Sequence, residues 1–240
     1  MDNFKDAFTF INLNWDTDFF GVNCAKATLH RPLTLSEWKK LKTKFIDYQF
    51  ISIMNKNSEP TNAKLIGKET SAFLADVNIQ FMKEIVSQVP MPEHISIQQA
   101  LKRNDEIIEL ADFQFSRFIE DPELAIRGGR EIYREWIKNS FGKLDKYFAI
   151  SKDTTGKING FLLFSYKGND CVIELIAVSK ESTKGGTGTS LFKAVEYEAY
   201  QKDCDKIIVG TQVRNSNAIN FYQKVGCKQV GSHQVFHYWL

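Results

Sequence analysis

A glycine-rich stretch between a predicted strand and a predicted helix constrains the fold of this chain more than any other part of its sequence. Residues 173–178 form an apolar run typical of a buried strand, and apolar residues recur at helical spacing from Leu191 to Ala199. Glycines let several backbone N–H groups turn toward one point, and the start of a helix adds a partial positive charge. We therefore expect an anion, most simply a diphosphate, to bind the residues in between: Lys184, Gly185, Gly186, Thr187, Gly188 and Thr189.

Two common nucleotide-binding loops do not fit this spacing. A Walker A loop needs a Lys-Ser/Thr pair directly after its last glycine, but Thr189 and Ser190 follow Gly188. A dinucleotide-binding loop needs a third glycine where this chain has Leu191. A third kind of loop, with two glycines one residue apart at a helix start, remains open. So does a plain flexible turn before an ordinary helix.

The pair Gly186-x-Gly188 resembles the pyrophosphate-binding loop of GNAT acetyltransferases, which holds coenzyme A. That family usually has Gln or Arg where this chain has Thr183, and Lys184 supplies a cation beside it. The resemblance implies that the anion expected at this loop is the diphosphate of acetyl-coenzyme A.

A second motif starts at Asn215, after the apolar run of residues 206–211. Its apolar residues recur at helical spacing up to Val225, and Gly226 is placed to end the helix. This motif resembles the second GNAT segment, in which an Asn begins a short helix and a Tyr, here Tyr222, lies beside the coenzyme A sulfur. From the residues alone, Tyr222 is equally consistent with an aromatic side chain packed at the end of a core helix.

The order of the elements after residue 105 predicts an α/β (α+β) fold. We expect a helix over residues 129–139, then strands over 147–151, 158–166, 171–178 and 206–211, with a final strand pair ending at Leu240. Hairpins followed by helical connections predict a mixed, mostly antiparallel sheet flanked by helices, which matches the GNAT fold. The apolar C-terminal residues either complete this sheet or pair with a second subunit, which makes a homodimer possible.

The N-terminal half has strand patterns over residues 50–54 and 71–81, and Pro90 and Pro92 indicate a linker. We expect residues 1–105 to form a substrate-side lobe, a smaller or degenerate α/β unit. Residues 106–240 then form the catalytic domain that binds acetyl-coenzyme A.

Composition excludes several classes of protein. The 240 residues are 43% hydrophobic and 25% charged with a net charge of +2, and no basic stripe predicts nucleic-acid binding. No apolar run is long enough for a membrane span, and the N-terminus lacks the apolar core of a signal peptide. Four scattered cysteines predict buried thiols in a reducing cytoplasm. His233 and His237 are too few for a metal site, so we expect no metal.

Three further segments narrow the resemblance: residues 13–21, 116–122 and 136–140. With them the chain looks like the dTDP-fucosamine N-acetyltransferase family, which acetylates the amine of a 4-amino-4,6-dideoxy sugar on a nucleotide carrier. This implies a small-molecule amine as substrate, in the form of a nucleotide sugar. Arg117 is the candidate residue for binding the diphosphate of this substrate, since a guanidinium forms two parallel hydrogen bonds with a phosphate. A surface salt bridge is equally consistent with its position.

The resemblance also implies how acetyl-coenzyme A lies. Its pantetheine is expected along the strand 173–178, with Ile176, Ala177 and Val178 supplying backbone groups, one of which donates to the thioester oxygen. Tyr222 is expected to protonate the leaving thiolate, and Glu174 is the one carboxylate nominated as base, with a water relay as the alternative. Two other readings stay open: transfer to a different small amine, amino acid, peptide or antibiotic, and a fold that binds coenzyme A without catalysis.

Overall fold

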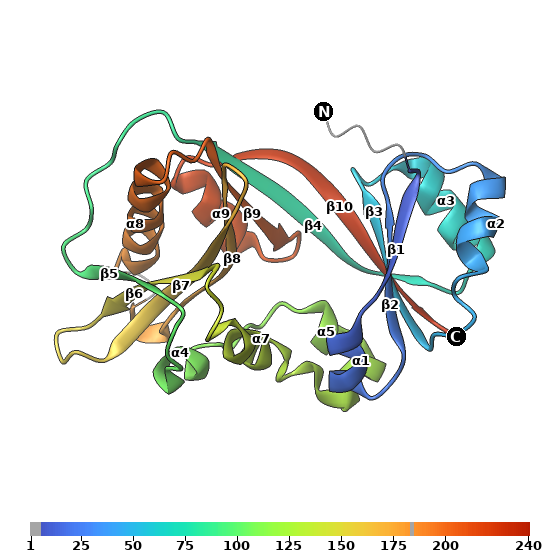
Figure 1. Cartoon of the computed structure of the whole chain (residues 1–240), viewed down its shortest axis with the longest axis horizontal. Coiled ribbons are helices and arrows are strands. Elements are labelled where there is room, and N and C mark those ends of the chain that lie inside the picture. Colours follow the sequence, from blue (N-terminus) through green and yellow to red (C-terminus); the bar gives the residue numbers. More distant parts are fainter. Residues whose placement is uncertain (1–5, 183–184) are drawn as a thin grey trace.

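One mixed β-sheet of ten strands runs through the part of the chain that the structure, a computed structural model, describes: residues 6–182 and 185–240 (Figure 1). The strands are β1 (Phe8–Asn12), β2 (Cys24–Leu29), β3 (Phe50–Lys56), β4 (Phe73–Glu84), β5 (Ile95–Gln99), β6 (Lys146–Lys152), β7 (Ile158–Lys167), β8 (Asp170–Val178), β9 (Lys206–Gln212) and β10 (Lys228–Trp239). Their order in the sheet is β1-β2-β3-β10-β4-β9-β8-β7-β6-β5. Only β2–β3 and β8–β9 are parallel, so the predicted fold class, a mostly antiparallel α/β sheet, is confirmed.

Helices cover both faces of this sheet (Figure 1). They are α1 (Asn14–Phe20), α2 (Leu35–Lys42), α3 (Pro60–Glu69), α4 (Asp105–Glu109), α5 (Arg117–Glu120), α6 (Pro122–Leu124), α7 (Ile132–Ser140), α8 (Thr187–Gln201) and α9 (Ser216–Lys224), with a π-helical turn at Ala125–Gly129 and a 3₁₀ turn at Lys180–Ser182. The expected helix over 129–139 is therefore α7, beginning three residues later.

β10 is a single long strand at the centre of the sheet, so the predicted final strand pair is wrong. Register shifts near Gly231 and Val235 bend β10 without breaking it. β10 pairs antiparallel with β3 on one edge and β4 on the other, and both β4 and β10 run between the two halves (Figure 1). The C-terminal strand thus completes the sheet and offers no edge to a second subunit. Residues on either side of the predicted division at residue 105 share this one sheet.

Strand β7 is buried on both faces, because helices lie above and below it. Phe161 and Leu163 pack in the cluster formed with α4 and α7, whereas Leu162 and Phe164 pack in the cluster formed with α8. Gly160 lets α8 approach closely: a Cβ there would lie 3.0 Å from Thr187 Cγ2 and 3.2 Å from Leu191 Cδ1. The N-terminal end of α8 is therefore fixed tightly against the sheet.

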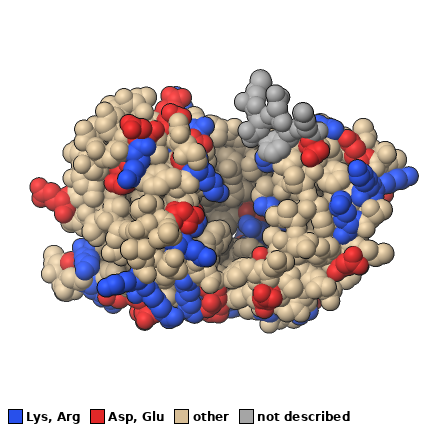
Figure 2. All heavy atoms as spheres, viewed as in Figure 1, with Lys and Arg blue, Asp and Glu red and all other residues tan. Residues whose placement is uncertain are grey.

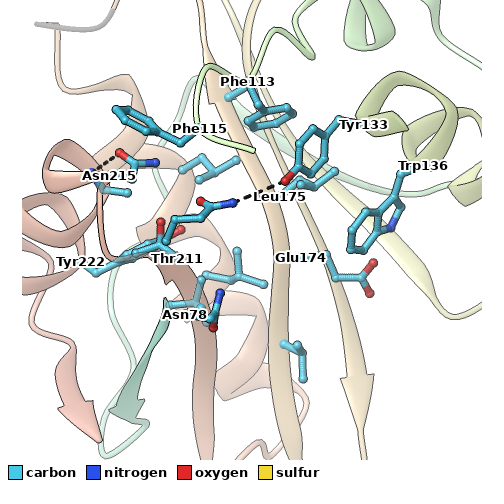
Figure 3. Close-up of a pocket in the computed structure, with 18 of the residues that line it drawn as sticks. Asn78, Phe113, Phe115, Tyr133, Trp136, Glu174, Leu175, Thr211, Asn215 and Tyr222 are labelled. Carbon is cyan, nitrogen blue, oxygen red and sulfur yellow. Dashed lines mark hydrogen bonds between the residues drawn. The ribbon is translucent and has the colours of Figure 1, made fainter. Parts of the chain in front are cut away.

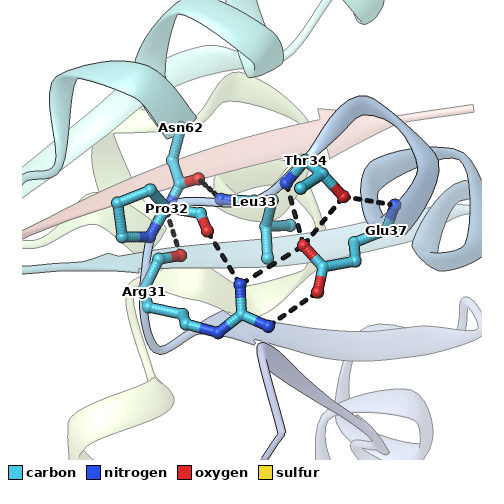
Figure 4. Close-up of polar contacts among 6 residues, drawn as sticks. All are labelled: Arg31, Pro32, Leu33, Thr34, Glu37 and Asn62. Atoms are coloured by element: carbon cyan, nitrogen blue, oxygen red, sulfur yellow. Dashed lines mark hydrogen bonds and ion pairs between the residues drawn. The ribbon is translucent and has the colours of Figure 1, made fainter.

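A second core lies between β1–β3 and the helices α2 and α3, and polar contacts hold its loops (Figure 4). Thr34 and Glu37 form a capping box at the start of α2, in which Thr34 N donates to Glu37 Oε2 at 2.8 Å. Arg31 pairs with Glu37 at 2.6 Å. The buried Asn62 accepts from Leu33 N at 2.9 Å, which ties α3 to the segment before α2. These contacts position β2 and β3, whose opposite face borders the site described below.

Candidate active site

A cleft opens where β8 and β9 part. The two strands pair only over Asp170–Val172 and Lys206–Ile208, and no further pairing joins them. At Glu174 a register shift between β7 and β8 leaves one extra residue on β8, a bulge that bends the strand. The resulting cleft has a volume of about 860 Å³. In Figure 3 Asn215 and Tyr222 lie on one side of it and Tyr133 and Trp136 on the other.

The edge of β8 that faces the cleft carries unpaired backbone groups. Ser179 N donates to Asn159 O at 2.8 Å, and Val178 is opposite Gly160 in the antiparallel register. Because bonded and non-bonded pairs alternate in such a ladder, the N–H and C=O of Val178 and Ile176 point away from β7 and toward the cleft. Ala177 points its backbone toward β7. Ile176, Ala177 and Val178 all line the cleft, but in this register only Ile176 and Val178 have backbone groups free for the predicted role.

The predicted anion loop leads directly into α8. Gly186 has φ +81°, a left-handed conformation, and is followed by the first helical residue, Thr187. Gly188 lies against α9, where a Cβ would come within 3.3 Å of Phe221. Thr187 is buried beside Gly160, while Thr189 continues the first turn of α8. Thr183 and Lys184 lie outside the described residues.

Helix α9 brings Asn215 and Tyr222 to the cleft. Asn215 caps the helix: its side-chain oxygen accepts from Ala218 N at 3.1 Å. Tyr222 is 3% exposed, and its ring lies 5.6 Å from that of Phe81 and 5.2 Å from that of Phe221, as centroid distances. Burial, with the nearby Cys227 second, raises the pKa of Tyr222. The phenol therefore stays protonated at neutral pH and lines the cleft as a hydrogen-bond donor.

Glu174 lies in the wall of the same cleft but is not unpaired. Its Oε1 contacts the ammonium of Lys146 and accepts from Ser165 Oγ at 2.6 Å. The Glu174 side chain is 9% exposed and that of Lys146 is 21% exposed, so the pair is largely shielded from solvent. Neither contact uses Oε2. The predicted role of Glu174 as base remains a prediction.

Arg117 begins α5 and lines the cleft together with two smaller cavities beside it. Its guanidinium lies 4.4 Å from the Phe118 ring centre. Within residues 6–182 and 185–240 no carboxylate lies within 4.0 Å of it, and its buried Nε has no hydrogen-bond partner there. The salt-bridge alternative for Arg117 is thus absent from the described structure.

Sequence reasoning missed several polar residues of the cleft. Asn78 and Gln80 on β4 reach into it opposite Gly210, where a Cβ would lie 2.5 Å from Asn78 Oδ1. Gln212 approaches the hydroxyl of Tyr133 at 3.5 Å (Figure 3). A glycine inside the apolar run 206–211 was the one available signal, because it indicates a close approach at that point.

Among residues 6–182 and 185–240, no three His, Cys, Asp or Glu side chains gather as metal ligands. None of the helices from residue 6 to 182 or from 185 to 240 is long and apolar enough to cross a membrane.

The acetyltransferase (GNAT) family model matches residues 104–227, just over half of the chain. The chain is 29% identical over 137 residues to the spore coat polysaccharide biosynthesis protein SpsD of Bacillus subtilis (strain 168), covering 55% of this chain and 46% of SpsD. It is 35% identical over 125 residues to the uncharacterized protein YdhI of the same organism, covering 51% of this chain and 70% of YdhI. The match to SpsD therefore spans less than half of that relative.

A shorter match joins this chain to N-alpha-acetyltransferase 30 of Homo sapiens, 31% identical over 68 residues, or 28% of this chain and 18% of that protein. Among solved structures, a GCN5-related N-acetyltransferase from Sphaerobacter thermophilus has a TM-score of 0.63 at 12% identity, covering 97% of this chain and 76% of that one. A tandem GNAT protein from the clavulanic acid biosynthesis pathway has a TM-score of 0.58 at 11% identity, covering 90% and 75%. At these identities the structures establish a shared fold.

Proposed function

Because this chain belongs to the GNAT acetyltransferase family, we propose that it transfers the acetyl group of acetyl-coenzyme A directly to a primary amine. The observation that carries the proposal is the parting of β8 and β9, which exposes the backbone of Ile176 and Val178 beside the buried phenol of Tyr222. In direct transfer the amine nitrogen attacks the thioester carbon, the C–S bond breaks, and the thiolate leaves. No covalent enzyme intermediate is required.

Two features of the described residues support acetyl-coenzyme A as the cofactor. The open edge of β8 offers backbone partners to the pantetheine, and the start of α8 behind Gly186 offers N–H groups to the diphosphate. Gly185 to Thr189 and Asn215 are the residues that we propose hold the cofactor, together with Lys184. The N–H of Val178 or Ile176 supplies a fixed donor for the thioester oxygen, on which charge develops as the amine attacks.

Tyr222 stabilises the leaving thiolate in this proposal. An ordinary thiol has a pKa of about 8.5, below the raised pKa of a buried phenol, so complete proton transfer from Tyr222 is uphill. A hydrogen bond from the phenol to the thiolate carries no such penalty. We therefore assign Tyr222 the role of donor to the sulfur, with the thiolate protonated later from solvent.

The amine must lose a proton before it attacks. Glu174 lies in the cleft wall, and its Oε2 is not used by Lys146 or Ser165. We propose that this oxygen receives the proton, directly or through one water. Lys146 and Ser165 both contact Oε1, which holds the carboxyl group in place with Oε2 left for the amine.

For the acceptor we propose the amine of a nucleotide-linked amino sugar of the dTDP-4-amino-4,6-dideoxyhexose type. Two observations support it: Arg117 borders the cleft without a carboxylate partner among the described residues, and SpsD is named for polysaccharide biosynthesis. A diphosphate suits a guanidinium that no acidic side chain occupies.

A thiol-release assay tests both levels of the proposal. Acetyl-coenzyme A is incubated with dTDP-4-amino-4,6-dideoxygalactose, with glucosamine, and with a peptide bearing a free N-terminus. We expect kcat/KM for the nucleotide sugar to exceed that for glucosamine by at least about 100-fold, since only the former reaches Arg117. Release with the peptide alone would contradict the sugar acceptor but keep the acetyltransferase. If none of the three amines gives thiol release, the proposed acetyltransferase activity is contradicted.

A further inference from the structure

A separate cavity of about 350 Å³ adjoins the cleft and has no role so far. Its floor comes from β2, β3 and β10 and its walls from the helices α1, α5 and α7. It shares Met54, Arg117, Phe118 and Trp136 with the cleft, so one ligand can reach into both. We call it the β10 cavity. Its other lining residues are Leu13, Trp15, Asp16, Lys26, Phe50, Ser52, Ile132, Asn139, Val235 and His237.

The floor of the β10 cavity carries a row of three polar side chains. Lys26 is opposite Ser52 in the parallel register of β2 and β3, and Ser52 is opposite His237 in the antiparallel register of β3 and β10. Neighbouring strands lie about 4.8 Å apart, so the row extends about 10 Å across one face of the sheet. Polar side chains in a line on an otherwise apolar floor are suited to forming hydrogen bonds with the edge of a planar heterocyclic ring.

His237 lines this cavity and carries a hydrogen-bond acceptor. Its Nδ1 lies 2.7 Å from Asp121 Oδ2, which also accepts from Trp239 Nε1 at 3.1 Å. Burial raises the pKa of Asp121, but the bonds from His237 and Trp239 together lower it further, so the carboxylate is ionised. An ionised carboxylate accepts the Nδ1 proton, which leaves Nε2 without one.

This Nε2 is buried and has no hydrogen-bond partner within the described residues, and the His237 side chain is 0% exposed. A buried acceptor without a donor is costly, on the order of 1–3 kcal/mol. A ligand N–H that enters the cavity would remove this cost.

Three charged side chains line the cavity without pairing with one another. In the described structure, Asp16, Lys26 and Arg117 form no ion pair within 4.0 Å. Burial and then Arg117 lower the pKa of Lys26, and burial raises the pKa of Asp16, so both of these groups are partly desolvated. Figure 2 shows basic and acidic atoms inside the hollow between the two halves. Arg117 lines both cavities and Lys26 lines the β10 cavity, so the two cations favour an anion in the middle of a ligand that reaches into both.

The walls are flat aromatic rings. Trp15 is stacked on Phe19 at 5.2 Å and Trp136 on Tyr133 at 6.2 Å, which fixes both indoles. Each indole is still partly exposed, 39% and 38%. Rings held in this way offer stacking surface at little further cost in conformational entropy.

We propose that the β10 cavity binds the base of a nucleoside diphosphate, with the diphosphate on Lys26 and on Arg117, which lines both cavities. A ring N–H donates to His237 Nε2, and the carbonyl group on one side of it accepts from Ser52, the neighbour of His237 in the row. Uracil and thymine present a ring N–H between two carbonyl groups, whereas cytosine has no ring N–H at that position. The inference rests on the proposed function only in that it places the reacting amine, on the other side of the diphosphate, in the cleft.

Calorimetry on the full chain saturated with coenzyme A tests this, with five probes: UDP, dTDP, CDP, glucose 1-phosphate and inorganic pyrophosphate. We expect UDP and dTDP to bind at least about tenfold more tightly than CDP, because CDP leaves Nε2 unpaired. They should also exceed glucose 1-phosphate and pyrophosphate at least about tenfold, because these lack the base. Equal binding of UDP and CDP would overturn the proposal, and so would tighter binding of glucose 1-phosphate.

A matched pair of variants tests the anion site. Lys26→Met should weaken UDP binding about tenfold and leave coenzyme A affinity unchanged, whereas Lys64→Met removes the same charge from the exposed surface of α3 and should change neither. Unaltered UDP affinity in Lys26→Met would overturn the role of Lys26. If the wild-type protein binds coenzyme A but not UDP, the base site is contradicted and the acetyltransferase proposal is kept. If coenzyme A does not bind, the proposed acetyltransferase function is contradicted.

Discussion

Replacing Tyr222 by Phe isolates the hydroxyl that faces the cleft. Among residues 6–182 and 185–240 this hydroxyl has no hydrogen-bond partner, and the ring contacts with Phe81 and Phe221 survive the change. The free protein therefore loses no internal bond, and its Tm should stay within a few degrees of wild type. Only an interaction made during the reaction is removed.

The size of the effect follows from the partner. A hydrogen bond to a charged group is worth about 1.5–3 kcal/mol, which corresponds to about a ten- to 150-fold loss in rate. The loss should appear in kcat, with little change in the KM for acetyl-coenzyme A, since charge on the sulfur develops only as the C–S bond breaks.

Steady-state thiol release measures both constants, and Tyr200→Phe provides the control. Tyr200 lies on α8, lines none of the cavities described above and is 39% exposed. The same substitution there should have no effect on either constant. An unchanged kcat in Tyr222→Phe would contradict the role of the hydroxyl as donor to the sulfur. So would a rise in KM with kcat intact, because that would mean a binding contact in place of a donor to the sulfur.

Three further predictions concern the loop, the core and the pH. Gly186→Val forces a β-branched residue to φ +81° at the start of α8 and should abolish measurable acetyl-coenzyme A binding in calorimetry, whereas Gly168→Val, at φ +59° in a hairpin, should leave binding intact. Lys83→Met strands the buried Glu196, 2.6 Å from Lys83 Nζ, and should cost about 3 kcal/mol in chemical denaturation; a loss below about 1 kcal/mol would contradict this. Burial holds the pKa of His237 below its ordinary 6.5, so the unfolded chain takes up the proton more readily and stability falls as pH drops through 6.5. Tm should decline from pH 7.5 to about 5.5, more steeply in wild type than in His237→Gln, and equal slopes would contradict the assignment.

The C-terminal half was largely predictable because its signals are local. The runs that became β7, β8 and β9 alternate or stay apolar over the length of a strand, and Gly186 and Asn215 lie at helix starts that the structure reproduces. Gly231-Ser232 resembles a turn but lies at a bulge within β10, and this explains the wrong strand pair at the C-terminus.

The N-terminal strands were harder to predict. β2 contains two alanines, which are depleted in strands, and β1 is short and largely exposed. The start of α2 is the exception, because Thr34 and Glu37 have the spacing of a capping box in the sequence itself.

The β10 cavity could not be predicted from one sequence at all. Its row of polar residues depends on pairing Lys26 with Ser52 and Ser52 with His237, across more than half of the chain. Nothing local marks such a register, since each residue alone is an ordinary polar position on a strand.

The central claim is that the cleft between β8 and β9 transfers an acetyl group to an amine. Mass spectrometry of one incubation tests it most directly: acetyl-coenzyme A, dTDP-4-amino-4,6-dideoxygalactose and either wild-type protein or Gly186→Val. We expect an N-acetylated nucleotide sugar with wild type and none above background with the variant. Equal product with both proteins would contradict the assigned cofactor site, and no acetylated product from this or any other amine would contradict the transferase.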